Sequence, residues 1–266
     1  MAAVRIATWN VNSIRSRVDR VVDWLGRSET DVLLMQETKA KDEQFPFARF
    51  EEPGYEVAHH GLNQWNGVAI ASRVGLEDVS VGFPDVPGWG DPAPPEARAI
   101  GATCGGVRAW SLYVPNGRTL DDPHLEYKLQ WLETLRAQTA AWRAAEPDLP
   151  LALGGDFNIA PFDEDVWDMS AFEGSTHVSP RERAAFQAFL DDGLVDVVRP
   201  HAPGPGTFTY WDYQQLAFPK KRGMRIDFVL GTPALADRVL GAAIDREERK
   251  GKGASDHAPV VVEPKD

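Results

Sequence analysis

Short apolar runs alternate along the chain with longer segments in which apolar residues recur at helical spacing. Between the first two runs, apolar side chains recur on one helical face from Ile14 to Leu25. This alternation of strand and helix patterns is typical of an α/β fold. The runs predicted as strands cover residues 4–9, 31–36, 67–72, 108–114, 151–154, 225–230 and 258–263.

Helix start signals and a proline-rich stretch divide the chain further. A long helix is predicted from residue 123 to about 145, and the run Ser-Pro-Arg-Glu at 179–182 is a good capped start for another. Thr-Pro at 232–233 opens a short helix. Residues 83–96 hold five prolines and two glycines, so we expect a loop there and assign it no role. We find no linker, and we predict a single domain over residues 1–266.

Composition restricts the class of protein. The chain has 266 residues, 43% of them hydrophobic and 26% charged, as in an ordinary globular protein. The longest apolar runs are far shorter than the roughly 20 residues of a membrane helix, and residues 1–5 do not resemble the start of a signal peptide. The single cysteine, Cys104, excludes an internal disulfide and a cysteine-based zinc site. We therefore expect a cytoplasmic protein with no membrane partner.

The charge balance argues at first against a nucleic-acid partner. Lys and Arg number 28 against 40 Asp and Glu, a formal net charge of −12, whereas phosphate binding usually uses clustered bases. The charge is unevenly spread, however. Residues 220–225 carry four bases and no acid, and residues 246–252 carry four bases and two acids. The position of these basic stretches therefore matters more than the net charge.

Polar residues gather at the ends of the predicted strands. Each has a structural alternative, because asparagines suit turns and helix caps, Glu37 could be a cap, and His257 could be a buried structural histidine. Asp227 is more informative, since a carboxylate inside an apolar strand is unfavourable to bury without a partner or metal. Sheets collect ligands at strand ends. The residues concerned are Asn10, Asn12, Glu37, Asp156, Asn158, Asp227, Asp256 and His257.

This set of side chains predicts a type of chemistry. Carboxylate and amide oxygens without cysteine suit Mg²⁺ or Mn²⁺, and Mg²⁺ often binds one or two carboxylates together with phosphate oxygens. An aspartate beside His257 can hold the imidazole in one tautomer or charge state. Metal, carboxylate and oriented histidine together describe hydrolysis of a phosphoester. The residues alone therefore predict a metal-dependent phosphoesterase.

Seven ordered blocks resemble one known family, the exonuclease III-type apurinic/apyrimidinic endonucleases of the endonuclease/exonuclease/phosphatase superfamily. They span nearly the whole chain, from residue 8 to residue 259. The resemblance implies a four-layered α/β sandwich, with two packed β-sheets flanked by helices, and a monomer. The blocks are Thr-Trp-Asn-Val-Asn-Ser-Ile-Arg at 8–15, Leu-Met-Gln-Glu-Thr-Lys at 34–39, Trp-Asn-Gly-Val-Ala-Ile at 65–70, Tyr-Val-Pro-Asn-Gly-Arg at 113–118, Gly-Asp-Phe-Asn-Ile-Ala-Pro at 155–161, Arg-Gly-Met-Arg-Ile-Asp at 222–227 and Ser-Asp-His-Ala-Pro at 255–259.

The resemblance also implies roles for single residues. Glu37 with Asn10 would hold the main Mg²⁺, for which Mn²⁺ is a possible substitute, and Asp256 would contribute to the metal centre. Asp227 would hold His257 against a phosphate oxygen. Asp156, oriented by Asn158, would activate water or protonate the leaving oxygen, and Tyr113 would contact the phosphate. The implied metal set is Asn10, Glu37, Asp156, Asn158, Asp256 and His257, and the implied catalytic set is Tyr113, Asp156, Asn158, Asp227 and His257.

A further set is implied to contact double-stranded DNA. If these residues do not contact DNA, the aromatic cluster at 208–213 would be core packing and the basic side chains would form a solvated face. In the family, this cluster and the positions of Met224 and Ile226 line a pocket for a flipped-out abasic sugar. Met224 and Tyr210 differ from many relatives, which leaves the balance between endonuclease and exonuclease action open. The set is Trp65, Asn66, Arg118, Tyr210, Trp211, Met224 and Arg225.

Three functions are compatible with these observations. The leading one is a DNA repair nuclease that cuts 5′ to abasic sites, leaves a 3′-hydroxyl, and acts on 3′ ends as an exonuclease and phosphodiesterase. The second is a phosphatase or phosphodiesterase acting on inositol phosphates or lipids, which the net charge of −12 mildly favours. The third is a non-catalytic binding protein. The filled polar positions argue against the third.

Overall fold

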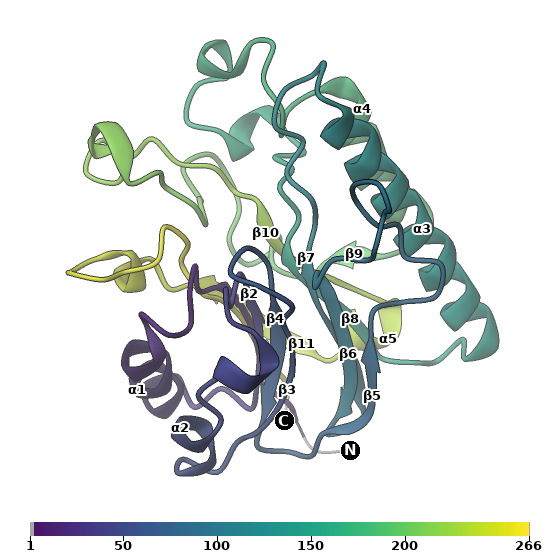
Figure 1. Cartoon of the computed structure of the whole chain (residues 1–266), viewed down its shortest axis with the longest axis vertical. Helices are drawn as coiled ribbons and strands as arrows, with labels where there is room; N and C mark the ends of the chain where they lie inside the picture. The colour runs from purple at the N-terminus through teal and green to yellow at the C-terminus, as the bar shows by residue number, and fades with distance from the viewer. Residues whose placement is uncertain (1–2, 266) are drawn as a thin grey trace.

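Two six-stranded β-sheets lie face to face in the computed structural model, which describes residues 3–265 (Figure 1). Sheet A consists of β1 (Ile6–Asn10), β2 (Val32–Gln36), β3 (Glu56–His60), β4 (Val68–Ser72), β11 (Val239–Ile244) and β12 (Val260–Pro264), in the order β11-β12-β1-β2-β4-β3. Sheet B consists of β5 (Glu77–Val81), β6 (Ala99–Cys104), β7 (Val107–Tyr113), β8 (Leu151–Asp156), β9 (Val195–Asp196) and β10 (Asp227–Gly231), in the order β5-β6-β7-β8-β10-β9.

Helices cover the outer faces of both sheets. The helices α1 (Val18–Ser28) and α2 (Ala48–Glu51) lie outside sheet A, and α3 (Pro123–Ala145) and α4 (Pro180–Asp191) lie outside sheet B (Figure 1). A short helix, α5 (Pro233–Ala236), follows β10. The predicted α/β sandwich of two packed sheets flanked by helices is confirmed. Within the described residues, no helix is long and apolar enough to cross a membrane.

The two long helices of sheet B begin where their capping signals predict. The Asp122 side chain accepts a hydrogen bond from the His124 amide at the start of α3. The Ser179 side chain accepts one from the Glu182 amide at the start of α4. Each helix has proline in its first turn, where the missing amide proton has no intrahelical partner to lose.

The apolar pattern misses β3, β5, β6, β9 and β11. The strands β3, β5, β9 and β11 lie at sheet edges and are partly solvated, so they lack a continuous apolar run. The inner strand β6 is buried but rich in small residues. A Cβ added at Gly101 would lie 2.6 Å from the Trp110 ring, so the ring of the neighbouring strand fills this space. A search for apolar runs therefore misses strands that are buried by large side chains of neighbouring strands.

The sheets share an apolar core, and a polar link through Gln36 and Ser111 crosses it. Leu34 of sheet A and Val229 of sheet B belong to the same buried cluster. Between the sheets, Gln36 Nε2 donates to Ser111 Oγ at 3.0 Å, and Ser111 Oγ donates to the Met35 carbonyl at 2.8 Å. A hydrogen bond between buried polar groups is specific in direction, whereas apolar contact is not. These bonds therefore align the sheets next to Glu37.

Gly155→Ala is expected to lower the free energy of unfolding, because the added Cβ would lie 1.9 Å from the Leu112 carbonyl oxygen. Overpacking a core costs about 1–3 kcal/mol, occasionally more. Gly26 in α1 is the control, since its added Cβ meets no described atom within 4 Å. Gly→Ala inside a helix stabilises by up to about 1 kcal/mol. Urea unfolding measures both, and an unchanged free energy for Gly155→Ala would contradict the close approach.

Candidate active site

Three predicted site residues form one row across sheet B. Asp156, the last residue of β8, pairs with Tyr113 at the end of β7 and with Asp227 at the start of β10. Because β7 and β8 run parallel and β10 runs antiparallel to β8, these ends meet at one edge of the sheet. The apolar pattern predicted that Asp227 lies inside a strand. In the structure, Asp227 is instead the first residue of β10.

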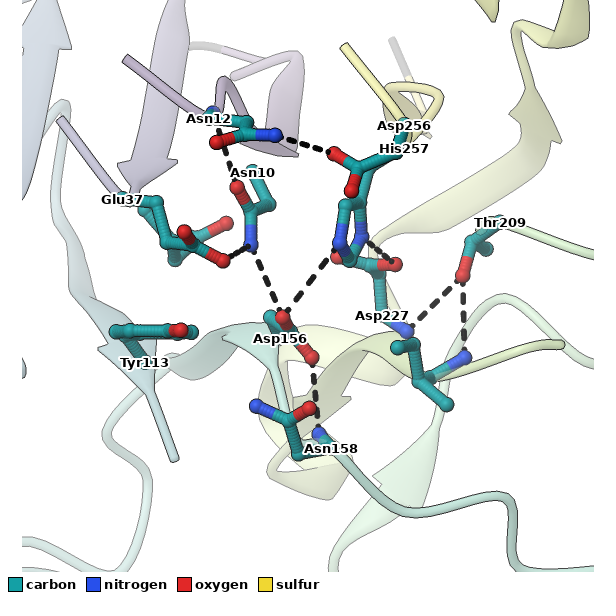
Figure 2. A network of polar contacts seen from close by, with 12 residues as sticks. Asn10, Asn12, Glu37, Tyr113, Asp156, Asn158, Thr209, Asp227, Asp256 and His257 are labelled. Carbon is teal, nitrogen blue, oxygen red and sulfur yellow. Dashed lines mark hydrogen bonds and ion pairs between the residues drawn. The ribbon is translucent and has the colours of Figure 1, made fainter. Parts of the chain in front are cut away.

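Sheet A brings its own polar residues to the same edge. Asn10 ends β1, and Glu37 directly follows the parallel strand β2. The Asp256-His257 pair precedes β12, which runs antiparallel to β1. The structure thus brings together residues from both sheets that are far apart in sequence (Figure 2).

Asn10 joins the two sheets through its side-chain amide. Its Nδ2 donates to Glu37 Oε1 at 2.8 Å and to Asp156 Oδ2 at 3.0 Å, while its Oδ1 accepts from the Asn12 amide at 3.0 Å (Figure 2). The amide group that faces the carboxylates is therefore the donor. In this arrangement Asn10 orients Glu37 and Asp156, and its oxygen is directed away from them.

His257 lies between two aspartates. Its Nδ1 is 2.8 Å from Asp227 Oδ2, and its Nε2 is 3.7 Å from Asp156 Oδ2 (Figure 2). Burial alone would lower the pKa of His257, but the carboxylates of Asp227 and Asp156 raise this pKa to about 10. The imidazole is therefore positively charged at neutral pH, and both ring nitrogens are proton donors.

Two nearby carboxylates differ in protonation. Burial raises the pKa of Asp156 to about 7. The charge of His257 acts to lower this pKa, whereas the carboxylates of Asp227 and Glu37 act to raise it. Burial also acts to raise the pKa of Glu37, but Lys39, with Nζ 2.8 Å from Glu37 Oε2, and the Asn10 amide lower it overall. At neutral pH Glu37 is ionised, while Asp156 is poised to exchange a proton.

Glu37, Asp156 and His257 are close enough to share a metal ion, since one ligand atom from each lies within 4.8 Å of the others. The two carboxylates offer the oxygen ligands that Mg²⁺ prefers. The charged imidazole has no free lone pair, so His257 does not fit as a ligand in this state. Asp256 Oδ1 accepts from Asn12 Nδ2 at 3.0 Å. The donor set fits a hard cation held mainly by Glu37 and Asp156.

Asn158 is held by protein partners on every side. Its backbone amide donates to Asp156 Oδ1 at 2.9 Å, and its Nδ2 donates to the Val114 carbonyl at 2.9 Å. Its Oδ1 accepts from Asn116 Nδ2 at 3.3 Å and lies 3.2 Å from His177 Nε2. This geometry suits the predicted role of orienting Asp156, and it occupies the amide oxygen with Asn116 and His177.

Sequence reasoning missed the groups behind Asn158. Lys128 and Glu182 form a fully buried ion pair of 2.6 Å, and Lys128 Nζ also donates to the Asn158 carbonyl at 2.6 Å. Burial and the charge of Lys128 lower the pKa of His177 to about 3, so this histidine is neutral. Asn116 lies inside the block at 113–118, which was a usable signal. Lys128 lies within a long helix, where a lysine carries no such signal.

A cavity of about 600 Å³ adjoins these residues. The Tyr210 ring centroid lies 4.9 Å from that of His257, which places this wall of the cavity beside the histidine. Three residues predicted to contact DNA, namely Arg118, Tyr210 and Met224, line this cavity. The lining includes Arg118, Trp167, His177, Tyr210, Arg222 and Met224. Trp65 is 68% exposed and is also available to a partner.

Three other predicted DNA contacts have buried side chains. Trp211 is 1% exposed and packs with Phe208 in a core cluster. Arg225 is 1% exposed and lies 3.2 Å from Asp196. Asn66 is also buried, and its Nδ2 donates to Glu96 at 2.9 Å. Direct DNA contact by these side chains stays a prediction, and their burial shows that a basic or aromatic residue type does not reveal whether tertiary packing covers it.

Comparison with known proteins supports the resemblance seen in the sequence. A family model described as the Endonuclease/Exonuclease/phosphatase family matches residues 7–257. Exodeoxyribonuclease III from Haemophilus influenzae is 30% identical over 276 residues, covering 98% of this chain and 99% of the relative. The resemblance therefore extends over almost the full length of both proteins.

Solved structures give the same result. The 3′-5′ exonuclease NExo from Neisseria meningitidis has a TM-score of 0.92 and 38% identity, covering 99% of this chain and 100% of that chain. The same values hold for the 3′ phosphatase NExo from Neisseria bound to a product DNA hairpin. An AP endonuclease from Archaeoglobus fulgidus has a TM-score of 0.91 and 36% identity, with coverage of 99% and 100%.

Asp227→Asn is expected to lower the pKa of His257, because it removes the carboxylate whose charge and hydrogen bond raise that pKa. An opposite charge at this distance shifts a pKa by about 1–3 units. Asp256→Asn is the control, since Asp256 makes a smaller contribution and should shift the pKa less. NMR titration of the His257 imidazole measures both. Equal pKa values in Asp227→Asn and the parent protein would contradict the electrostatic assignment.

Proposed function

The chain belongs to the endonuclease/exonuclease/phosphatase family, and we propose that it hydrolyses the phosphodiester 5′ to abasic sites in duplex DNA in a Mg²⁺-dependent reaction. The product carries a 3′-hydroxyl. The proposal includes 3′-5′ exonuclease and 3′-phosphodiesterase action on duplex DNA, by a monomer that works in the cytoplasm. The observation that carries it is the cluster of Glu37, Asp156 and His257 beside a large cavity.

The relatives support a nuclease that acts on DNA. Over nearly the full chain, similarity extends to an exodeoxyribonuclease III, an AP endonuclease and a 3′ phosphatase solved with a product DNA hairpin. All three names describe hydrolysis of a phosphoester, and two name activity at a DNA end. The chain is therefore a DNA repair nuclease, and the abasic-site preference is the specific part of the proposal.

Glu37 and Asp156 would hold the Mg²⁺, or Mn²⁺ as a substitute, which would stabilise negative charge on the phosphate as a Lewis acid. Glu37 suits this position because its pKa is lowered and it stays ionised. Asn10 keeps the two carboxylates at a set separation by donating to both. The ligand role of Asp256 stays a prediction, and its Oδ1 accepts a hydrogen bond from Asn12 Nδ2.

Asp156 handles the proton of the reaction. With a pKa of about 7, it has both forms available near neutral pH, and it would either accept a proton from the attacking water or, when protonated, donate one to the leaving 3′ oxygen. The water oxygen forms a bond to phosphorus as the bond between phosphorus and the 3′ oxygen breaks. The Asn158 amide donates to Asp156 Oδ1, which leaves Oδ2 on the side of Asn10 and His257.

His257 and Tyr113 are donors to the phosphate. His257 is charged and held by Asp227, so its Nε2 proton can neutralise a non-bridging oxygen as charge develops there. Burial and the Glu37 carboxylate raise the pKa of Tyr113 well above its usual value, so the phenol keeps its proton and donates it in a hydrogen bond. Both groups are fixed before substrate binds, which is the basis of electrostatic catalysis.

Glu37→Gln and His257→Gln are expected to lower kcat by about 10²–10⁴-fold, because each removes a charge that acts on the phosphate. The assay uses a labelled duplex with one abasic-site analogue and an intact duplex, each with Mg²⁺ or EDTA. Glu43→Gln is the control, since its side chain is 71% exposed and lies outside the site. Metal-dependent cutting 5′ to the analogue, lost in both site variants, is the expected result.

Two outcomes would contradict this proposal. A 3′-digestion ladder on both duplexes, without incision at the analogue, would remove the abasic-site preference and leave the exonuclease. No cleavage of any duplex by folded protein with Mg²⁺ or Mn²⁺ would remove DNA as the substrate, and phosphatase substrates such as inositol phosphates would be tested next.

A further inference from the structure

The proline-rich segment at 83–96 is held against the start of α3 and ends beside the site. The Trp89 ring lies 4.6 Å from the His124 ring and 5.4 Å from the Tyr127 ring, measured between centroids. Glu96 is the last residue of the segment. Its side chain is 23% exposed, so most of it lies inside the protein.

Glu96 accepts hydrogen bonds from three different parts of the chain. Its Oε2 accepts from Arg98 Nε at 2.7 Å and from the Tyr127 hydroxyl at 3.0 Å. Its Oε1 accepts from Asn66 Nδ2 at 2.9 Å. Arg98 and Tyr127 belong to the half of the molecule built on sheet B, whereas Asn66 directly precedes the β4 region of sheet A. Glu96 is therefore a polar bridge between the two halves.

One arm of this bridge leads to Glu37. The Asn66 carbonyl accepts from the Lys39 amide at 2.8 Å, and the Gly67 carbonyl accepts from the Thr38 amide at 3.1 Å. Glu37 and Lys39 both have a positive φ, 50° and 49°, which is a backbone conformation that residues other than glycine rarely adopt. Such a conformation persists only where surrounding contacts hold it. The 66–67 segment supplies such contacts for Thr38 and Lys39, the two residues that follow Glu37.

The other arm leads to Tyr113. The Arg98 guanidinium lies 4.8 Å from the centroid of the Tyr113 ring and covers its face. Arg98 Nη1 also donates to the Tyr113 carbonyl at 3.4 Å, and the Tyr113 amide donates to the Arg98 carbonyl at 2.8 Å. Because the Arg98 side chain is only 7% exposed, its direction depends on Glu96, which is its ionic partner. Glu96 therefore orients the group that orients Tyr113.

We propose that Glu96 is a positioning residue, which sets the Glu37 carboxylate of sheet A relative to the Tyr113 phenol of sheet B. This inference rests on the proposed function, in which both groups act on the same phosphate. It assigns a role to the proline-rich segment, whose packing against α3 carries Glu96 to the junction of the sheets. A mutation far from the reacting atoms that misplaces a catalytic group by about 1 Å can lower a rate about 100-fold.

The test compares Glu96→Gln with Asp85→Asn, a matched exchange of carboxylate for amide at an exposed position in the same segment. Glu96→Gln removes the ionic partner of Arg98 with almost no change in shape. We expect kcat for duplex cleavage to fall about 10- to 100-fold with KM within about threefold, and Asp85→Asn to retain parent values. Thermal unfolding of each variant shows whether the fold persists.

A double-mutant cycle separates positioning from simple anchoring of the loop. If Glu96 acts through Tyr113, the Glu96→Gln effect should be several-fold smaller in a Tyr113→Phe background. If the two effects on kcat multiply independently, the positioning role is overturned. Arg98→Lys is the second variant, since it keeps the charge but loses the planar group over the ring, and it should reproduce the kcat loss.

Mn²⁺ binding, followed by electron paramagnetic resonance, provides a readout that does not depend on cleavage. Glu96→Gln is expected to raise the Kd for Mn²⁺ several-fold, because Glu37 loses its fixed position, while Asp85→Asn leaves it unchanged. If the parent protein cuts no duplex, the proposed function fails, and the Mn²⁺ result still decides whether Glu96 positions Glu37. An unchanged Kd in folded Glu96→Gln would overturn that part of the proposal.

Discussion

Glu37, Asp156, Asp227 and His257 are buried or nearly buried at the edge where the two sheets meet. Three carboxylates at such close range repel one another, and burial removes the water that would otherwise screen them. The charged imidazole between Asp227 and Asp156 offsets part of this repulsion, and Lys39 offsets another part at Glu37. The remaining negative charge is what a divalent cation would compensate. The electrostatics of one small cluster thus determine both the protonation states and the need for a metal.

This cluster exists only because the sheets are aligned with each other. Glu37 belongs to one sheet and Asp156 to the other, and the Asn10 amide reaches both. The alignment is held below the site by the buried Gln36–Ser111 bond, where hydrogen-bond direction prevents the sliding that an apolar core alone would allow. Farther out, the Lys128–Glu182 pair supports the Asn158 turn. A buried ion pair is weak evidence for stability, so its value here lies in fixing position.

The different environments of similar residues divide the chemistry among them. Glu37 has cationic and amide partners and stays ionised, whereas the pKa of Asp156 is raised to about 7, so both of its protonation states are available near neutral pH. His257 is raised to about 10 and stays charged, whereas His177, buried beside Lys128, is lowered to about 3 and stays neutral. Two carboxylates and two histidines therefore differ in protonation, which is set by their neighbours and not by residue type.

The sequence by itself determined the α/β class, the capped helices α3 and α4, the strand-end residues and the family, because periodicity, caps and motif order are local properties of the chain. It also placed Tyr113 and Asp156 near strand ends and Asp227 inside a strand, although the row they form needed the register of β7, β8 and β10. Only the tertiary structure decided that Trp211 and Arg225 are buried and that Glu96 and Lys128 support the site. Burial and charge pairing depend on residues distant in sequence, so they arise only when the two sheets pack together.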